Sequence, residues 1–162
     1  MKLNSEQKEI VELFVKQELI IKRLYILFSR RYLEYKAFWE GMAKEEHEHA
    51  AMIQRIYEHD STDMFEFTQG DLRSSSLNSS MKFLEGLISE FQSDKEFPIT
   101  KAVSIALHLE KALWERKVFQ YFEGDSEEVK RIMNTLNLEQ ELHIKKLDKF
   151  AWQIEETNRL KE

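Results

Sequence analysis

The residues of this chain best suited to chemistry are carboxylates, an amide and imidazoles that interrupt otherwise apolar helical patterns. Glu46 and His49 lie three positions apart, and Gln140 and His143 repeat that spacing in the last quarter of the sequence. Carboxylate oxygens and imidazole nitrogens bind iron, manganese and zinc. A buried carboxylate or imidazole costs free energy unless a partner compensates for it. We therefore expect either a metal ion or a buried hydrogen-bonded network where these residues meet.

The stretch around Glu46 and His49 predicts an amphipathic helix. Its apolar positions recur at alternating steps of three and four, which is the spacing of a buried helix face. The positions on this face are Trp39, Met42, Glu46, His49, Ile53 and Ile56. Glu46 and His49 thus occupy the middle of a face that is otherwise apolar.

Three further stretches show the same periodicity, and each carries polar residues in the middle of its apolar face. One face consists of Val11, Phe14, Glu18, Ile21, Tyr25, Phe28 and Tyr32. A second consists of Val103, Ala106, Leu107, Glu110, Leu113, Trp114, Val118, Tyr121 and Phe122. A third consists of Val129, Met133, Leu136, Gln140, His143, Leu147, Phe150 and Ile154. The interruptions are Glu18 in the first, Glu110 in the second, and Gln140 with His143 in the third.

The helix ends are marked unevenly along the chain. Asn4 or Ser5, with Gln7 reaching back, predicts a capping box at the start of the first helix. No Gly or Pro falls between residues 20 and 38, so a single helix of about 50 residues is an alternative. Because helices longer than about 25 residues are unusual in globular proteins, we place a tight break at 30–35.

The third helix has clearer limits. Pro98 marks its start and Gly124–Asp125 its end. Asp125 with Glu128 predicts a capping box for the helix that follows.

The segment between the second and third helices has a different character. Residues 61–80 are rich in Ser, Asp and Thr and predict a loop that includes Ser74–Ser76, whereas 80–92 predicts a short amphipathic helix. A connection of roughly 40 residues is far longer than a tight turn needs. It is long enough to cross a bundle from end to end, so that the helices before and after it run parallel.

The positions of the interrupting residues predict that they meet at one level. The midpoint between Glu110 and Gln140 is residue 125, at the Gly124–Asp125 turn. Antiparallel helices of equal rise would therefore bring these two side chains face to face. The midpoint between Glu18 and Glu46 is residue 32, inside the predicted first break.

The composition predicts one all-α domain spanning residues 1–162. Hydrophobic residues make up 42%, while Gly (4) and Pro (1) are scarce. The absence of cysteine excludes disulfides, thiol nucleophiles and cysteine-ligated metal sites. A formal net charge of −6 argues against nucleic acid as the partner. With no signal pattern and no apolar run of about 18 residues, a cytoplasmic protein without a membrane span is expected.

The ordered pattern of Glu, Glu-x-x-His, Glu and Gln-x-x-His, with a long central connection, resembles the ferritin-like superfamily and its rubrerythrin-like branch. The stretch FWEGMAKEEHEHAAMI is similar to that family's second helix, and IALHLEKALWERKVFQYF to its third. The resemblance covers nearly the whole chain. It implies a ferritin-like four-helix bundle with a long crossover, containing a short helix, between the second and third helices.

The resemblance also implies a set of metal ligands and a chemistry. Glu18 and His49 would bind one iron ion, Glu110 and His143 a second, and Glu46 would bridge the two. Manganese or zinc would fit the same ligands. The reaction implied is oxidation of Fe(II), or reduction of dioxygen or peroxide. The rubredoxin-like part of full rubrerythrins has no counterpart here because cysteine is absent, so electrons would come from an external donor.

One residue departs from the family pattern. Gln140 stands where the family has a second bridging carboxylate, which leaves one fewer negative charge beside two dications. The neighbouring Glu139 is a candidate replacement.

Two other functions stay open on this scaffold. One is a helical interaction or regulatory module with a vestigial site, and the other is a mononuclear metal site at Glu18, Glu46 and His49. The apolar residues Met64, Phe65 and Phe67 in the central connection point to a homo-oligomer, with a dimer as the expected state.

Overall fold

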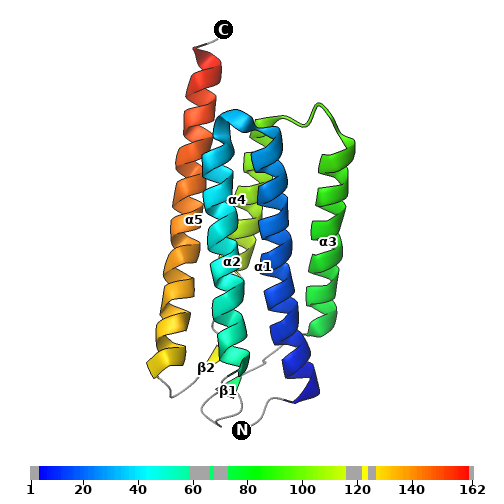
Figure 1. Cartoon of the computed structure of the whole chain (residues 1–162), viewed down its shortest axis with the longest axis vertical. Helices are drawn as coiled ribbons and strands as arrows, with labels where there is room; N and C mark the ends of the chain where they lie inside the picture. Colours follow the sequence, from blue (N-terminus) through cyan, green and yellow to red (C-terminus); the bar gives the residue numbers. More distant parts are fainter. Residues whose placement is uncertain (1–3, 59–65, 68–72, 116–121, 124–126, 161–162) are drawn as a thin grey trace.

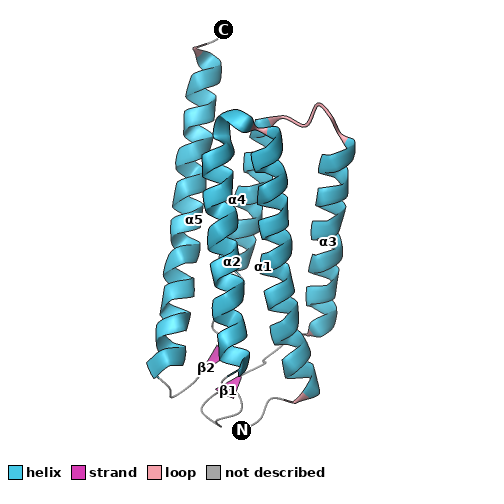
Figure 2. Cartoon of the chain, viewed as in Figure 1, coloured by secondary structure: helices cyan, strands magenta, loops and turns pink. Residues whose placement is uncertain are grey.

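The computed structural model describes residues 4–58, 66–67, 73–115, 122–123 and 127–160, and they form a helical bundle. Its helices are α1 (Ser5–Arg31), α2 (Lys36–Glu58), α3 (Ser74–Ser93), α4 (Ile99–Glu115) and α5 (Glu127–Arg159). Four helices, α1, α2, α4 and α5, lie side by side and are called the bundle helices below, and α3 flanks α1 on the outside (Figure 1). Figure 2 shows how completely helix dominates the described residues, which confirms the expected all-α class.

The chain reverses direction at each helix. In Figure 1, α1, α3 and α5 run one way along the long axis, while α2 and α4 run the other way. Two short strands, β1 (Glu66–Phe67) and β2 (Phe122–Glu123), pair antiparallel at the end of the bundle where α2 and α4 finish. This pairing ties together the segments that follow those two helices.

The first helix begins and ends where the sequence predicts. The Asn4 side chain accepts a hydrogen bond from the Gln7 backbone, and the Gln7 side chain accepts one from the Asn4 backbone, both at 2.9 Å. At the other end α1 stops at Arg31, and the 3-10 turn η1 (Leu33–Tyr35) connects it to α2. The Tyr32 hydroxyl fixes this turn by donating to the Phe97 carbonyl at 2.7 Å. The predicted break is confirmed, and the single long helix is excluded.

Helix α3 corresponds to the short amphipathic helix expected at 80–92, but it starts earlier, at Ser74. Ser74, Ser75 and Ser76 form its first turn, so the predicted loop through these serines is wrong. The physical reason is Leu77, which is only 4% exposed and packs against the end of α1. It extends the apolar face of Leu84, Ile88 and Phe91 toward the N-terminus by two turns.

Helix α4 differs from prediction at its C-terminal end. Its described residues end at Glu115, and Phe122 lies in strand β2 rather than on a continuing helix. Pairing of the Phe122 backbone with Phe67 replaces the helical hydrogen bonds expected there. Several predicted positions lie outside the described residues or have side chains that are not described; they are Ile56, Met64, Phe65, Phe67, Leu113, Trp114, Val118, Tyr121, Gly124, Asp125, Glu128 and Val129.

The core consists of two hydrophobic clusters with a polar layer between them. One cluster lies toward the α1–α2 turn and includes Tyr25, Phe28, Trp39, Leu147 and Phe150. The other lies toward the opposite end and includes Ile10, Phe14, Ile53, Met133 and Leu136. On α1, α2 and α5 the interrupting polar residues fall between these two groups in sequence. The apolar clusters therefore close the polar layer from both ends of the bundle.

Within the described residues, no helix combines the length and apolar character that crossing a membrane requires.

Candidate metal centre

The four bundle helices bring all six interrupting residues into the interior of the protein. Each of them is at most 3% exposed, and the members of this polar layer are Glu18 from α1, Glu46 and His49 from α2, Glu110 from α4, and Gln140 and His143 from α5. Their burial follows from their place on the apolar faces. The sequence pattern therefore predicts their burial correctly, and it also predicts that they meet at one level along the bundle axis.

Glu46 lies between the two imidazoles and presents one oxygen to each. Its Oε2 is 3.4 Å from His49 Nδ1, and its Oε1 is 3.0 Å from His143 Nδ1. The two rings are nearly parallel, with centroids 5.0 Å apart and an interplanar angle of 28°. Both Nδ1 atoms therefore lie close to the same carboxylate, each beside a different oxygen.

The remaining carboxylates divide between the two imidazoles. Glu18 Oε2 lies 3.9 Å from His49 Nδ1, and Glu110 Oε2 lies 3.5 Å from His143 Nδ1. Glu110 is held from its other oxygen by the Tyr25 hydroxyl, which donates to Oε1 at 2.6 Å. Tyr25 also packs its ring against Trp39, so it combines aromatic packing with orientation of a candidate ligand.

Gln140 faces Glu110, as their symmetric spacing about residue 125 predicts. Its Nε2 donates to Glu110 Oε2 and, at 3.3 Å, to the Glu110 backbone carbonyl. The amide thus supplies hydrogen bonds where a carboxylate would supply negative charge. In this arrangement Gln140 supports Glu110 and leaves Glu46 as the carboxylate shared by both imidazoles.

Two outer carboxylates that we did not predict in these positions approach the far nitrogens of the imidazoles. His49 Nε2 hydrogen-bonds Glu139 Oε2 at 2.9 Å, so Glu139 supports His49 on the neighbouring helix and does not replace Gln140. His143 Nε2 lies 2.8 Å from Glu45 Oε2, although without hydrogen-bond alignment. Glu45 also accepts from Lys146 Nζ at 2.7 Å.

The contacts of these outer carboxylates run between α2 and α5, and both carboxylates belong to a motif that repeats in the sequence. Each outer carboxylate lies four residues before a histidine of its own helix but contacts the histidine of the other helix. The motif Glu-[Glu/Gln]-x-x-His, present at 45–49 and 139–143, carries this information. Glu45 is one-third exposed, so it lies at the border between the polar layer and the solvated face of α2.

Burial and charge act together on the protonation of the layer. Burial raises the pKa of Glu18, and the nearby Glu46 carboxylate raises it further against the opposing effect of His49. For His49, burial alone would lower the pKa, but the nearby carboxylates of Glu18 and Glu46 outweigh this effect and raise the pKa to about 10. The same balance, with Glu110, Glu45 and Glu46 as partners, raises the pKa of His143 to about 12. The two imidazoles are therefore held as cations by the carboxylates when no metal replaces their protons.

The inward atoms of the layer fit the requirements of a metal ion. Within the described residues, Glu18 Oε2, Glu46 Oε1, His49 Nδ1 and His143 Nδ1 are buried without a hydrogen-bond partner. Native structures rarely leave buried polar atoms in this state. Glu46, His49 and His143 each offer a ligand atom within 4.8 Å of the others, a grouping that could hold a metal ion. The carboxylate and imidazole donor set suits iron, manganese or zinc.

Comparison with known proteins found no protein-family model, no curated protein and no solved structure that matches this chain.

Proposed function

We propose that this chain is a non-haem di-metal carboxylate protein of the rubrerythrin-like, ferritin-like type that binds two iron ions. The observation that carries the proposal is the position of Glu46, whose two oxygens face two different imidazoles at 3.4 and 3.0 Å. A carboxylate that presents one oxygen to each of two separate ligands is the arrangement of a bridge between two metal ions. The opposite course of α2 and α5, and the parallel course of α2 and α4, support the same family resemblance.

The layer divides into two half-sites around this carboxylate. Glu18 and His49 would bind one ion with Glu46 Oε2, and Glu110 and His143 would bind the other with Glu46 Oε1. Both imidazoles would use Nδ1, because their Nε2 atoms are directed to outer carboxylates. Such outer contacts fix the orientation of a ligating histidine.

The chemistry proposed is oxidation of Fe(II) by dioxygen or hydrogen peroxide, with iron supplying the electrons. A hydrogen peroxide molecule would take one electron from each of two Fe(II) ions and two protons, and its O–O bond would break to give two waters. The chain's part is to orient and to exclude water. Tyr25 holds Glu110, and the two hydrophobic clusters close the layer from both ends. Catalytic turnover would require an external electron donor, and we expect a homo-oligomer.

A specific observation favours a second candidate, a site that binds one metal or none. Gln140 donates a hydrogen bond to one oxygen of the Glu110 carboxylate and Tyr25 donates to the other, which satisfies that carboxylate without a metal. A mononuclear site would then use Glu46 with His49 and His143, or with Glu18 and His49. A chain that binds no metal would be a helical interaction module with a vestigial polar layer.

Metal stoichiometry separates these functions. We would titrate metal-free protein with Fe(II) under anaerobic conditions, measure bound iron per chain, and then follow ferric absorbance after adding dioxygen or hydrogen peroxide. The di-metal proposal expects two irons per chain and oxidation of both.

Variants test the assigned bridge. Glu46→Gln keeps the size of the side chain but should lose at least one iron and the fast oxidation. The matched control is Glu48→Gln, which changes an exposed carboxylate on the same helix and should retain both. One iron in the unmodified chain would establish the mononuclear alternative, and no iron would leave the interaction module.

A further inference from the structure

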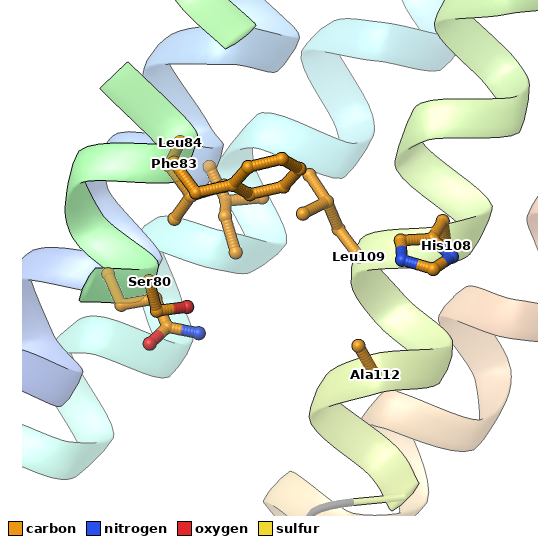
Figure 3. A pocket seen from close by; sticks show the side chains of 8 residues that line it. Ser80, Phe83, Leu84, His108, Leu109 and Ala112 are labelled. Carbon is orange, nitrogen blue, oxygen red and sulfur yellow. The ribbon is translucent and has the colours of Figure 1, made fainter. Parts of the chain in front are cut away.

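A small cavity lies on the side of the bundle that α3 covers. Its volume is about 80 Å³, and Figure 3 shows Ser80, Phe83 and Leu84 reaching it from α3 and His108, Leu109 and Ala112 from α4. Gln17 and Ile21 of α1 complete the lining. The cavity therefore lies at the junction of three helices, two of which also carry candidate metal ligands.

A wider pocket continues this cavity along the α3–α4 side. It has a volume of about 210 Å³ and shares Phe83, His108 and Leu109 with the smaller cavity. The Phe83 ring extends from α3 toward α4 in Figure 3, and its side chain is 55% exposed. Phe83 and His108 thus stand at the border between the outer pocket and the inner cavity.

The inner wall of the cavity lies at the same level of α1 and α4 as the metal centre, because two of its residues neighbour candidate ligands in sequence. Gln17 directly precedes Glu18, and Leu109 directly precedes Glu110. Gln17 is 4% exposed, and its Oε1 has no hydrogen-bond partner within the described residues. A buried carbonyl oxygen without a donor is costly, so a molecule in the cavity that donates a hydrogen bond would relieve that cost.

The lining indicates what kind of molecule the cavity accepts. None of the described residues that line it is acidic or carries an ammonium group, and most of its wall is aliphatic or aromatic. A bare cation would lose its hydration there without compensation. The opposite side of the centre is different, since Glu45 and Glu139 lie one-third exposed beside the imidazoles.

We propose that the cavity lined by Gln17, Ala112 and Phe83 is the passage by which a small uncharged oxidant, dioxygen or hydrogen peroxide, reaches the centre. The inference rests on the proposed function, and it assigns to Gln17 the role of hydrogen-bond acceptor for peroxide in the passage. Dioxygen has no donor and would use the apolar wall alone.

The test compares two Ala→Phe variants. Ala112→Phe fills this cavity, and Ala151→Phe fills a separate pocket of about 230 Å³ between α4 and α5. Both alanines are partly buried, so the two substitutions should change the stability of the bundle by similar amounts. Xenon binds apolar cavities, and its occupancy in crystals of the metal-free protein reports access without any metal. We expect xenon in the cavity of the unmodified chain and of Ala151→Phe, and none in Ala112→Phe.

Kinetics of the iron-loaded protein provide the second measurement. Ala112→Phe should bind iron with unchanged stoichiometry yet react with both oxidants about tenfold more slowly, which corresponds to a barrier raised by about 1.4 kcal/mol. Ala151→Phe should react at the unmodified rate. Gln17→Leu should slow the reaction with hydrogen peroxide and leave that with dioxygen unchanged.

Each contrary outcome has its own meaning. Absence of xenon from the unmodified cavity, or an unmodified oxidation rate in Ala112→Phe, would overturn the passage while leaving the metal centre intact. An unmodified peroxide rate in Gln17→Leu would overturn the role given to Gln17. Failure of the unmodified chain to take up iron would overturn both the proposed function and the passage, and the anaerobic titration alone would reveal it.

Discussion

At the scale of single residues, the outer carboxylates Glu139 and Glu45 fix the orientation of the two imidazole rings. Glu139 and Glu45 contact the Nε2 atoms of His49 and His143, and these contacts leave both Nδ1 atoms directed at Glu46. Removing such a contact from a ligating histidine typically lowers metal affinity by about 10- to 100-fold.

We predict that Glu139→Gln and Glu45→Gln each lower metal affinity by about tenfold or more, because each frees one imidazole. Glu139→Gln should weaken the half-site of His49, and Glu45→Gln that of His143. Competition of the protein with a chelator of known affinity for Mn(II) measures the effect. Glu141→Gln is the control, because it removes an exposed carboxylate near Glu139 and Gln140 that pairs with Lys145. Equal affinities for all three variants would show that the outer contacts do not support the ligands.

Protonation of the same imidazoles makes the metal-free protein sensitive to pH. The pKa of His49 rises from 6.5 to about 10, and that of His143 from 6.5 to about 12. Because the folded pKa values lie above the unfolded ones, the stabilisation is fully present below pH 6.5 and is lost as pH rises toward 10 and beyond. Glu18 acts in the same direction, since burial raises its pKa.

We therefore predict that the metal-free protein becomes less stable between pH 6.5 and 10, which urea unfolding at several pH values measures. At pH 7 metal binding should release about three protons, one from each imidazolium and one from the Glu18 carboxyl, because a ligating imidazole must be neutral and a ligating carboxyl group ionised. Calorimetry in buffers of different ionisation enthalpy counts them. His47→Gln, which changes an exposed histidine of the same helix, should retain both behaviours. Metal binding without proton release would contradict the pairing of these histidines with carboxylates.

The residues of the polar layer could be predicted from the sequence because their spacing places them on apolar faces. Glu18, Glu46, His49, Glu110, Gln140 and His143 are all buried as expected. The contacts of Glu45 and Glu139 were not predictable in the same way. They depend on the rotation of α2 and α5 about their axes, which decides whether a residue beside the buried face points to solvent or to the neighbouring helix.

At the scale of helices, α2 contains a feature that works against its own stability. Gly41 lies inside the helix, is exposed, and has no atom within 4 Å of the position where a Cβ would be. Glycine inside a helix costs roughly 0.5–1 kcal/mol relative to alanine because the unfolded chain loses more conformational freedom.

We predict that Gly41→Ala stabilises the protein by about 0.5–1 kcal/mol without changing metal affinity. Chemical denaturation gives the free energy of unfolding, and Mn(II) competition gives the affinity. Gly86→Ala in α3 offers a matched comparison. A Cβ at this position also meets open space inside a helix, but α3 is not one of the four bundle helices. A destabilised Gly41→Ala would mean that a second surface covers this position in solution.

Helix limits followed the sequence where a local signal sets them and departed from it where distant contacts do. The Asn4–Gln7 capping box and the break after Arg31 are local, and both are confirmed. The start of α3 is set by burial of Leu77 against α1, and the strand at Phe122 is set by a partner some 55 residues earlier in the chain. Periodicity within a segment cannot predict either of these, because each needs the tertiary arrangement first.

At the scale of the whole molecule, the polar layer is the part of the bundle interior that contributes least hydrophobic stabilisation. Two hydrophobic clusters stabilise the two ends, and between them lie carboxylates and imidazoles, four of whose inward atoms have no hydrogen-bond partner within the described residues. Bound metal would join side chains of the four bundle helices at this level. Metal binding should therefore stabilise the bundle as a unit.

We predict that Mn(II) at 100 times its dissociation constant stabilises the protein by about 2.7 kcal/mol for each ion bound, and therefore by about 5.4 kcal/mol if two ions bind. For a chain of this size each 2.7 kcal/mol raises the melting temperature by roughly 5–10 °C. Differential scanning calorimetry with and without Mn(II) measures the shift. Glu46→Ala should abolish it, because this carboxylate faces both imidazoles, and Glu48→Ala should preserve it. An unchanged melting temperature of the unmodified chain would favour the interaction module, since a vestigial layer held by Gln140 and Tyr25 needs no metal. A shift that survives Glu46→Ala would place the metal elsewhere in the molecule and would contradict the bridge on which the proposed function depends.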